Sequence, residues 1–378
     1  MRSRSTISSV IEDRPLAGAF YPLRVAEIVP QTREAVAVTF EVPPELRERF
    51  RFLHGQYVTL RAEVDGEDVR RSYSICSGAH EDRLRVAIKR VAGGMFSSWA
   101  HQALVPGATI AVAPPEGRFT VALAPERDRH YLGIAAGSGI TPVLSILRTT
   151  LALEPHSRFT LVYGNRASSS MMFRDELQDL KDTYLERLSL AFVMSREGQD
   201  IDLFSGRIDR AKCDALFASW IDLSTVDVAF ICGPEAMSHA VRDSLLAHGM
   251  PPASVKTELF LAAGTTPRVA RVRPPEERSE EVAATVVIDG RERRFGIAKG
   301  SETVLDAGLR AGIELPYSCK GGVCATCRAV LVSGEVDMDR NFALEDYEVR
   351  RGFILTCQSY PVTDAVRVDY DRAAHALG

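Results

Sequence analysis

The stretch Cys319-Lys320-Gly321-Gly322-Val323-Cys324-Ala325-Thr326-Cys327 carries three closely spaced cysteines, and a fourth, Cys357, follows farther along the chain. Cys-x4-Cys-x2-Cys with a distant fourth cysteine is the spacing with which four thiolates hold a plant-type two-iron, two-sulfur (2Fe-2S) cluster. Gly321-Gly322 lets the backbone approach an anionic cluster and point N–H groups at sulfur. Structural zinc sites, the alternative, favour two separated cysteine pairs. The four cysteines are therefore the predicted iron ligands.

Length and composition indicate an ordinary globular protein. With 378 residues, 46% hydrophobic and 25% charged, the chain is expected to form two or three domains. A net charge of -4 and the lack of a Lys/Arg-rich run argue against a nucleic-acid partner. The longest apolar stretch, 132–147, is interrupted by glycines and Pro142, so no membrane span is predicted. Three further cysteines stand isolated, which fits a reducing compartment, and a cytoplasmic location is expected.

The rhythm of expected strands and helices divides the chain. Residues 1–19 are expected to be a loose leader, and the short strands and turns of residues 20–125 predict a small antiparallel β-barrel. Residues 126–262 alternate strands and helices, as in a parallel doubly wound α/β sheet. Residues 263–281 are rich in proline and charge and are expected to be a linker. A small third domain at 282–378 carries the cysteine loop.

Two motifs in the expected barrel indicate a phosphate-bearing cofactor. Arg71-Ser72-Tyr73-Ser74 closes a strand, and Gly93-Gly94-Met95-Phe96-Ser97 opens a helical pattern with a helix expected from Ser98 to Leu104. Free N–H groups and the helix dipole both attract anions to a helix N-terminus. Alone, each motif is as well explained by a surface strand or a simple turn. In this order, and beside a nucleotide-type sheet, they point to a flavin.

Two further turns lie at strand ends of the expected parallel sheet. Gly137-Ser138-Gly139-Ile140-Thr141-Pro142 follows its first strand, where a dinucleotide pyrophosphate would bind, although Pro142 breaks the regular GxGxxG pattern. Cys232-Gly233-Pro234-Glu235-Ala236-Met237 follows a later strand and places Cys232 at the carboxyl edge of the sheet. A structural turn and a buried small hydrophobe are the respective alternatives.

In this order, the motifs RSYS, GGMFSS, GSGITP, YGNR and CGPEAM resemble those of the ferredoxin-NADP reductase superfamily, and the cysteine loop resembles its fused ferredoxin module. The resemblance extends over nearly the whole chain after about residue 20. LPYSCKGGVCATCRA, MDRNFALEDYEVRRGFILTCQ and MSREGQD are most similar to the reductase subunits of bacterial phenylacetyl-CoA epoxidases. The resemblance implies an FAD-binding antiparallel β-barrel, an NAD(P)-binding α/β doubly wound domain and an α+β β-grasp ferredoxin domain.

The resemblance also implies roles for single residues. Residues of the barrel domain would contact the flavin and its pyrophosphate, with the Ser74 hydroxyl near the flavin N5: Arg71, Tyr73, Ser74, Gly94 and Ser97. Residues of the second domain would lie along the nicotinamide dinucleotide: Gly137, Gly139 and Thr141, with Cys232 beside the nicotinamide ring. Glu258-Leu259-Phe260 resembles an acidic-x-aromatic segment near the flavin. Ser74, Cys232 and Glu258 are the implied catalytic residues, and Phe260 an implied cofactor contact.

NADPH is expected to be preferred over NADH. The second strand of the parallel sheet ends at Tyr163-Gly164-Asn165-Arg166, without an acidic residue for a ribose 2′-hydroxyl. Ser195-Arg196 follows the next strand, as in relatives whose Ser-Arg pair binds the 2′-phosphate, and a guanidinium suits that dianion. An exposed loop with a solvated arginine explains the pair equally well, so NADH stays the alternative.

A hydride delivers two electrons and the cluster accepts one, so a flavin must sit between them. We expect a reductase that passes electrons from NADPH through FAD to the 2Fe-2S cluster and on to a separate oxygenase component, a di-iron phenylacetyl-CoA epoxidase. A Rieske-type oxygenase as partner, direct reduction of a small molecule and a redox-sensing scaffold are the alternatives. Six carboxylates from Glu335 to Glu348 form either a docking face for the oxygenase or a solvated face.

Overall fold

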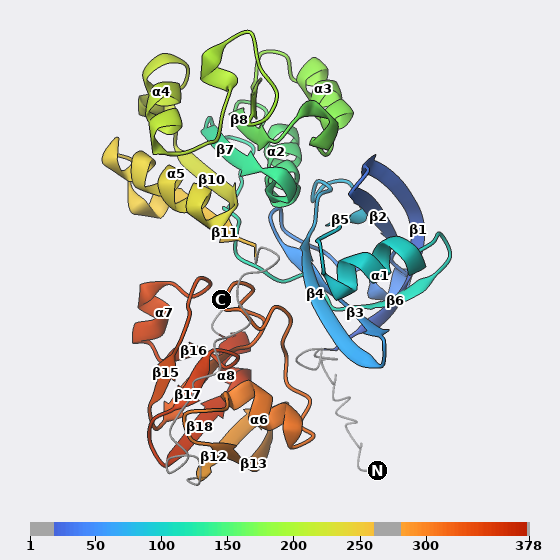
Figure 1. Cartoon of the computed structure of the whole chain (residues 1–378), viewed down its shortest axis with the longest axis vertical. Coiled ribbons are helices and arrows are strands. Elements are labelled where there is room, and N and C mark those ends of the chain that lie inside the picture. Colours follow the sequence, from blue (N-terminus) through green and yellow to red (C-terminus); the bar gives the residue numbers. More distant parts are fainter. Residues whose placement is uncertain (1–18, 261–280, 376–378) are drawn as a thin grey trace, which may run out of the picture.

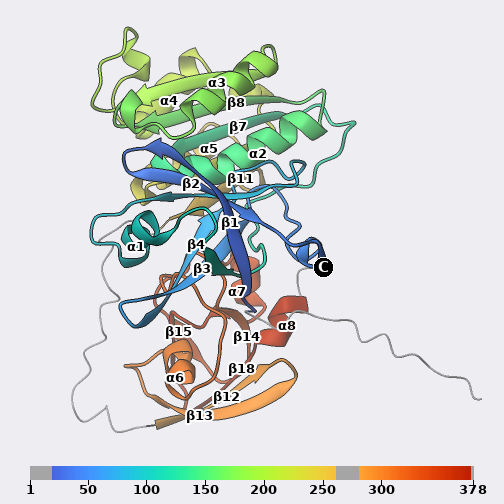
Figure 2. The same ribbon diagram turned by 90° about the vertical axis from the view of Figure 1, so that its right-hand side faces the viewer.

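The computed structural model describes residues 19–260 and 281–375 (Figure 1). Their strands form three main sheets and one small two-stranded sheet. Figures 1 and 2 show the parallel sheet with its helices at one end of the molecule, the sheet that carries the cysteine loop at the other, and the antiparallel sheet between them. Apart from their last residues, the expected leader (1–19) and linker (263–281) lie outside the described residues.

The first sheet is a six-stranded antiparallel sheet in the order β4-β3-β6-β1-β2-β5. Its elements are β1 (Tyr21–Thr32), β2 (Ala35–Glu41), β3 (Tyr57–Val64), β4 (Glu67–Ser74), β5 (Leu84–Lys89), α1 (Met95–Ala103) and β6 (Thr109–Val112). Alternating apolar residues such as Leu23 and Val25 are fully buried, as the two-residue repeat of a half-buried strand requires. A bridge between Ile75 and Val86 joins the two ends of the sheet into a barrel.

The second sheet has five parallel strands in the order β11-β10-β7-β8-β9. Its elements are β7 (His130–Ala136), α2 (Ile140–Leu153), β8 (Arg158–Asn165), α3 (Arg174–Thr183), β9 (Leu188–Met194), α4 (Arg210–Ser219), β10 (Val228–Gly233), α5 (Glu235–Ala247) and β11 (Val255–Leu259). The chain order reverses between β7 and β10, and ligands of open parallel sheets bind at the carboxyl ends of the strands beside such a reversal.

The third sheet is mixed, in the order β13-β12-β18-β14-β16, and β15 pairs with β17 beside it. Its elements are β12 (Glu281–Ile288), β13 (Arg291–Ala298), α6 (Val304–Arg310), β14 (Arg328–Ser333), β15 (Val336–Met338), α7 (Asp346–Arg350), β16 (Phe353–Leu355), β17 (Ser359–Pro361), β18 (Ala365–Asp369) and α8 (Tyr370–His375). Cys327 and Cys357 belong to the hydrophobic core of this domain, so its packing and its cysteine loop are one unit.

The expected fold class, an antiparallel barrel, a doubly wound α/β domain and a small α+β domain, is confirmed. Short 3-10 helices lie at η1 (Pro44–Leu46), η2 (Gly137–Gly139), η3 (Ser168–Ser170), η4 (Asp202–Phe204), η5 (Leu223–Thr225) and η6 (Pro252–Ser254). Helix α2 begins at Ile140, so Pro142 lies in its first turn. Pro142 is tolerated there because the first N–H groups of a helix have no acceptor within the helix. None of the helices in the described ranges is long and apolar enough to cross a bilayer.

Candidate functional site: a nicotinamide pocket, a flavin face and a cysteine loop

The cysteine loop lies between α6 and β14 and places its four thiols in two pairs. The side chains of Cys319 and Cys324 interact with each other, and those of Cys327 and Cys357 do the same. Among the residues that the structure describes, no three His, Cys, Asp or Glu side chains converge on one point. Two pairs suit a cluster of two irons with two thiolates on each. The arrangement therefore fits the predicted 2Fe-2S cluster.

The backbone of this loop is turned toward sulfur. Lys320, Gly322 and Ala325 have left-handed φ angles of 50°, 81° and 54°. A Cβ on Gly322 would lie 2.9 Å from the carbonyl oxygen of Arg340, so glycine alone fits there. These turns let the loop wrap closely around a compact group.

Backbone N–H groups of the loop donate to sulfur. The N–H of Gly321 lies 3.3 Å from Cys319 Sγ, and the N–H of Cys319 lies 3.5 Å from Cys324 Sγ. Interaction with the Cys324 thiol, and then the backbone N–H groups of Gly321, Val323 and Cys324, lower the pKa of Cys319 to about 6, although burial opposes this shift. A thiol that ionises this easily is suited to metal binding, because the thiolate is the ligand form.

The residues expected at the flavin lie on β4 and at the start of α1, and together they are called the flavin face. The Tyr73 ring lies half-buried against Phe96, with their centroids 5.7 Å apart, and Arg71 is exposed. No side chain caps the N-terminus of α1 after Gly94, which leaves first-turn N–H groups for an anion. The Ser97 hydroxyl donates to the Gly94 carbonyl at 3.3 Å and so shapes this turn. These residues fit a flavin with a phosphate-bearing tail.

Ser74 and Glu258 meet at the junction of the first two domains. Ser74 Oγ donates to Glu258 Oε2 at 3.1 Å, and Glu258 is paired with Cys232 in the register of β10 and β11. Desolvation raises the pKa of Glu258 to about 8, although the hydrogen bond from Ser74 opposes this shift. Burial, and then the carboxylate of Glu258, raise the pKa of Cys232. The structure thus brings together the three residues expected to be catalytic and keeps Glu258 protonated near neutral pH.

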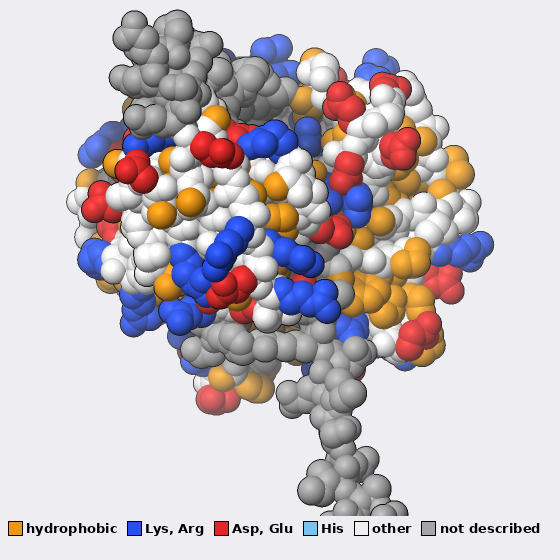
Figure 3. Space-filling view, turned by 90° about the horizontal axis from the view of Figure 1, so that it is seen from below, with side chains coloured by type: hydrophobic (Ala, Val, Ile, Leu, Met, Phe, Trp, Pro, Cys, Tyr) orange, Lys and Arg blue, Asp and Glu red, His pale blue; other side chains and the backbone are white. Residues whose placement is uncertain are grey.

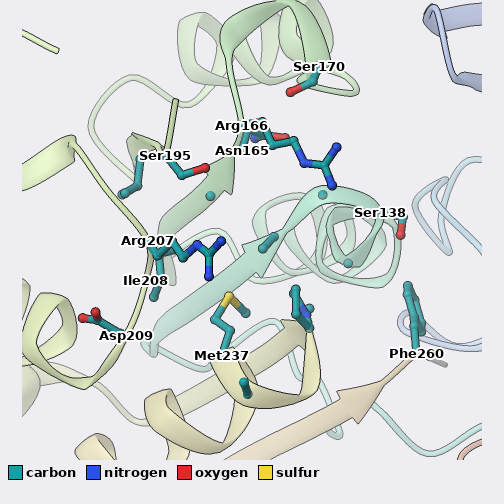
Figure 4. Close-up of a pocket in the computed structure, with 18 of the residues that line it drawn as sticks. Ser138, Asn165, Arg166, Ser170, Ser195, Arg207, Ile208, Asp209, Met237 and Phe260 are labelled. Carbon is teal, nitrogen blue, oxygen red and sulfur yellow. The ribbon is translucent and has the colours of Figure 1, made fainter. Parts of the chain in front are cut away.

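A cavity of about 630 Å³ opens at the chain reversal between β7 and β10 (Figure 4). Gly137, Gly139, Ser195 and Phe260 line it, as expected for nicotinamide-site residues and for the aromatic residue near the flavin. Gly139 could not carry a side chain, because a Cβ there would lie 2.1 Å from the carbonyl oxygen of Cys232. The cavity has the location and lining of a dinucleotide site.

Three residues expected at the nicotinamide dinucleotide do not line the cavity: Cys232, Thr141 and Arg196. Cys232 is fully buried. Thr141 is buried, and its hydroxyl donates to the Ser138 carbonyl at 2.9 Å, which closes the first turn of α2. Arg196 is exposed, and its backbone N–H donates to the carbonyl of Arg166. Of the Ser195-Arg196 pair, only Ser195 reaches the pocket.

The cavity has cationic and amide side chains that the motifs did not single out for binding. In Figure 4, Arg166 and Arg207 extend into it from two loops, one after β8 and one after η4. Lys89, at the end of β5 of the barrel, lines the same cavity, and Asn165 Nδ2 is buried without a partner among the described residues. The YGNR motif could have identified Asn165 and Arg166, because they end a parallel strand. Lys89 and Arg207 reach the site only through tertiary packing.

Taken together, these sites allow reducing equivalents to enter at a nicotinamide pocket, pass the flavin face and leave through the cysteine loop. This sequence of sites defines a flavin-dependent oxidoreductase with a fused ferredoxin domain.

Comparisons with known proteins agree with this class. The family descriptions "Oxidoreductase FAD-binding domain", "Oxidoreductase NAD-binding domain" and "2Fe-2S iron-sulfur cluster binding domain" match residues 22–121, 134–243 and 286–362. The chain therefore belongs to the ferredoxin-NADP reductase superfamily, in its form with a C-terminal plant-type ferredoxin domain.

Individual relatives share the whole arrangement. A component of the 1,2-phenylacetyl-CoA epoxidase of Escherichia coli (strain K12) is 47% identical over 93% of this chain and 98% of its own. "3-ketosteroid-9-alpha-monooxygenase, ferredoxin reductase component" of Mycobacterium tuberculosis is 34% identical over 97% of this chain and 100% of its own. The structure of phthalate dioxygenase reductase has a TM-score of 0.56 at 24% identity, covering 93% of this chain and 98% of that one, and supports the fold.

Replacing Cys324 with Ala is expected to remove the visible absorption of the cluster and to leave flavin reduction by NADPH intact. The reason is that each iron needs both thiolates of its pair, whereas the flavin face lies in another domain. Iron content per chain and the flavin absorbance after NADPH addition measure the two effects. Cys76→Ala and Cys213→Ala are matched controls, because both cysteines are buried away from the loop, and both should keep two irons. A Cys324→Ala protein with two irons per chain would contradict the assignment.

Replacing Gly139 with Ala is expected to lower the melting temperature and to weaken NADPH binding. The new methyl group would collide with the Cys232 carbonyl, and such overpacking costs about 1–3 kcal/mol. Thermal unfolding and titration with NADPH measure both effects. Gly198→Ala is the control, since no atom would lie within 4 Å of its Cβ. Equal behaviour of the two variants would show that the turn tolerates a side chain.

Proposed function

We propose that this protein is the reductase component of a di-iron phenylacetyl-CoA epoxidase, passing electrons from NADPH through FAD and its 2Fe-2S cluster to the oxygenase component. The 47% identity to a component of such an epoxidase, over 98% of that relative, supports this partner. The observation that carries the electron path is the arrangement around β4. Its Ser74 meets Glu258 beside the nicotinamide pocket, and its Ser72 meets Ser318 beside the cysteine loop.

We infer that the residues of the first site act around a hydride transfer. FAD, when bound, would take two electrons from NADPH and release them singly to the cluster. Tyr73 would cover the flavin ring, and Arg71 and the N-terminus of α1 would hold its phosphates. Cys232 and Glu258 would lie on the nicotinamide side. There the Glu258 carboxyl, whose raised pKa favours its protonated form, accepts a hydrogen bond from the Ser74 hydroxyl.

The acidic docking face needs a correction. Glu348 was expected to be one of its six carboxylates, but it is buried and paired with Arg118 and Arg328. Glu345 and Asp346 remain exposed at the start of α7 and are the proposed docking groups for a basic patch of the oxygenase.

The end of the ferredoxin domain away from α7 carries basic side chains (Figure 1). Seen from below, Lys and Arg side chains gather on this face (Figure 3), and β13 contributes the exposed Arg291, Arg293 and Arg294. A basic partner patch would be repelled there. Charge therefore supports docking on the acidic side of this domain.

We also propose domain boundaries at 20–125, 126–262 and 282–378 and a cytoplasmic location. The three sheets and the matched ranges support these boundaries. Seven cysteines without a disulfide bond support a reducing compartment.

The proposal is tested by mixing the holoprotein, NADPH, phenylacetyl-CoA and a purified di-iron epoxidase component. Epoxide should form only when all are present, and ferricyanide should be reduced without the epoxidase. Substituting the terminal oxygenase of a 3-ketosteroid 9-alpha-monooxygenase is the control. Electron delivery to that oxygenase but not to the epoxidase, or rapid turnover of a small molecule without any protein partner, would refute the proposed partner.

We further propose that NADPH is preferred because Arg166 and Arg207 hold its 2′-phosphate. Both guanidinium groups extend into the cavity, whereas Arg196 does not line it. Arg207→Gln is expected to reduce kcat/KM for NADPH about 10- to 100-fold, the value of a charge-assisted hydrogen bond, and to change that for NADH little.

Steady-state kinetics with both nucleotides measure this difference. Arg196→Gln is the matched control, since it removes the same charge from the neighbouring loop outside the cavity. A larger loss with NADPH in Arg196→Gln than in Arg207→Gln would restore the Ser195-Arg196 interpretation. Higher efficiency of the unaltered protein with NADH would refute the preference.

A further inference from the structure

The barrel and the ferredoxin domain contact each other through β3, β4 and the cysteine loop. The Tyr57 hydroxyl of β3 donates to the carbonyl oxygen of Cys324 and lies 3.1 Å from Thr326 Oγ1. The Ser72 hydroxyl of β4 donates to Ser318 Oγ at 2.8 Å. All three partner atoms lie within the cysteine loop or directly before it. The contact therefore involves the part of the ferredoxin domain that holds the iron ligands.

A charged contact accompanies these hydrogen bonds. Glu348 is only 2% exposed, and its Oε1 lies 2.5 Å from Arg118 Nη1 and 2.7 Å from Arg328 Nη1. Arg328 directly follows the ligand Cys327 in the same domain, whereas Arg118 follows β6 of the barrel. Arg118 also donates to the carbonyl oxygen of Ala343 at 3.0 Å. One guanidinium from the barrel is thus held by two acceptors of the ferredoxin domain.

The fold of the ferredoxin domain does not explain this second arginine. A buried carboxylate needs a cation, and Arg328 already supplies one within the domain. In the described part of the chain, the hydrogen bonds and ion pairs of the Arg118 side chain go to ferredoxin-domain atoms. Arg118 therefore links the barrel to the ferredoxin domain.

The attachment lies close to the flavin side of β4. Ser72 and Ser74 are two residues apart on one face of the strand, about 7 Å along it. Ser74 contacts Glu258 beside the nicotinamide pocket, and Ser72 contacts Ser318 beside Cys319. Because electron tunnelling slows exponentially with distance, a cysteine loop docked here is well placed to accept electrons, and an undocked loop is not.

We propose that Arg118 is a positioning residue that, together with Tyr57, docks the cysteine loop on the barrel for electron transfer from FAD to the cluster. This inference rests on the proposed electron path but not on the identity of the oxygenase. Each transfer oxidises the reduced FAD by one electron and reduces the cluster by one, and no bond in the protein is made or broken. The role of Arg118 is to keep the two domains in contact while this happens.

The test uses the full-length holoprotein with the substitution Arg118→Gln and no oxygenase. Stopped-flow absorbance after mixing with NADPH separates flavin reduction from cluster reduction. Flavin reduction should be unchanged, and cluster reduction should slow about tenfold or more, as for loss of one partner of a buried charge pair. Hydrogen exchange in the oxidised protein, without NADPH, should become faster in β3, β4 and residues 318–326.

Three further variants control the experiment. Arg51→Gln removes an arginine of the same barrel whose only ion pair in the described residues, with Glu48, is solvent-exposed, and it should change neither reading. Arg118→Lys keeps the charge and should restore part of the rate. Tyr57→Phe removes only the hydroxyl that reaches Cys324 and should slow cluster reduction without slowing flavin reduction.

Two results would overturn the proposal. In one, Arg118→Gln leaves both cluster reduction and hydrogen exchange unaltered. In the other, exchange increases but the rate of cluster reduction does not change, so that the contact holds the domains without serving electron transfer. Failure of the proposed function looks different, because the unaltered protein would then reduce its own cluster with NADPH but not the epoxidase.

Discussion

Strand β4 is the element on which the arrangement of the three domains depends. Its pleat directs Ser74 and Ser72 to one face, so one strand makes hydrogen bonds to the nucleotide domain through Glu258 and to the ferredoxin domain through Ser318. The register of β3 and β4 pairs Tyr57 with Ser74. A slip of one residue would turn Tyr57 and its neighbours to the opposite face and separate the cysteine loop from the barrel.

A half-buried ion network joins the barrel and the nucleotide domain. Glu176 of α3 accepts two hydrogen bonds from Arg85 of β5, at 2.9 and 2.7 Å, and one from Arg148 of α2 at 2.7 Å. Lys89 lies at the end of the same β5 and lines the pocket. Removing one partner of such a network leaves an uncompensated charge, so these groups hold the two halves of the pocket in one geometry.

The motifs were reliable where a short stretch of chain makes the whole feature. The spacing of Cys319, Cys324 and Cys327 is set by one loop, and the close approach of Gly139 to Cys232 follows from a turn at a strand end. Motif reading was less informative for Thr141, whose hydroxyl closes a helix turn, and for Arg196, which does not line the cavity. In both cases the residue lies in the expected motif, but its side chain is directed by local packing.

The sequence by itself determined the class of fold and the presence of flavin, nicotinamide and 2Fe-2S domains, because these follow from strand and helix periodicity and from spacings within single turns. Only the tertiary structure decided which cations enter the pocket and which carboxylates are exposed. Lys89 and Arg207 come together from two domains, and Glu348, in an acidic run, is buried between Arg118 and Arg328. Burial and the choice of a charged partner depend on contacts between residues far apart in the chain, and no local pattern records them.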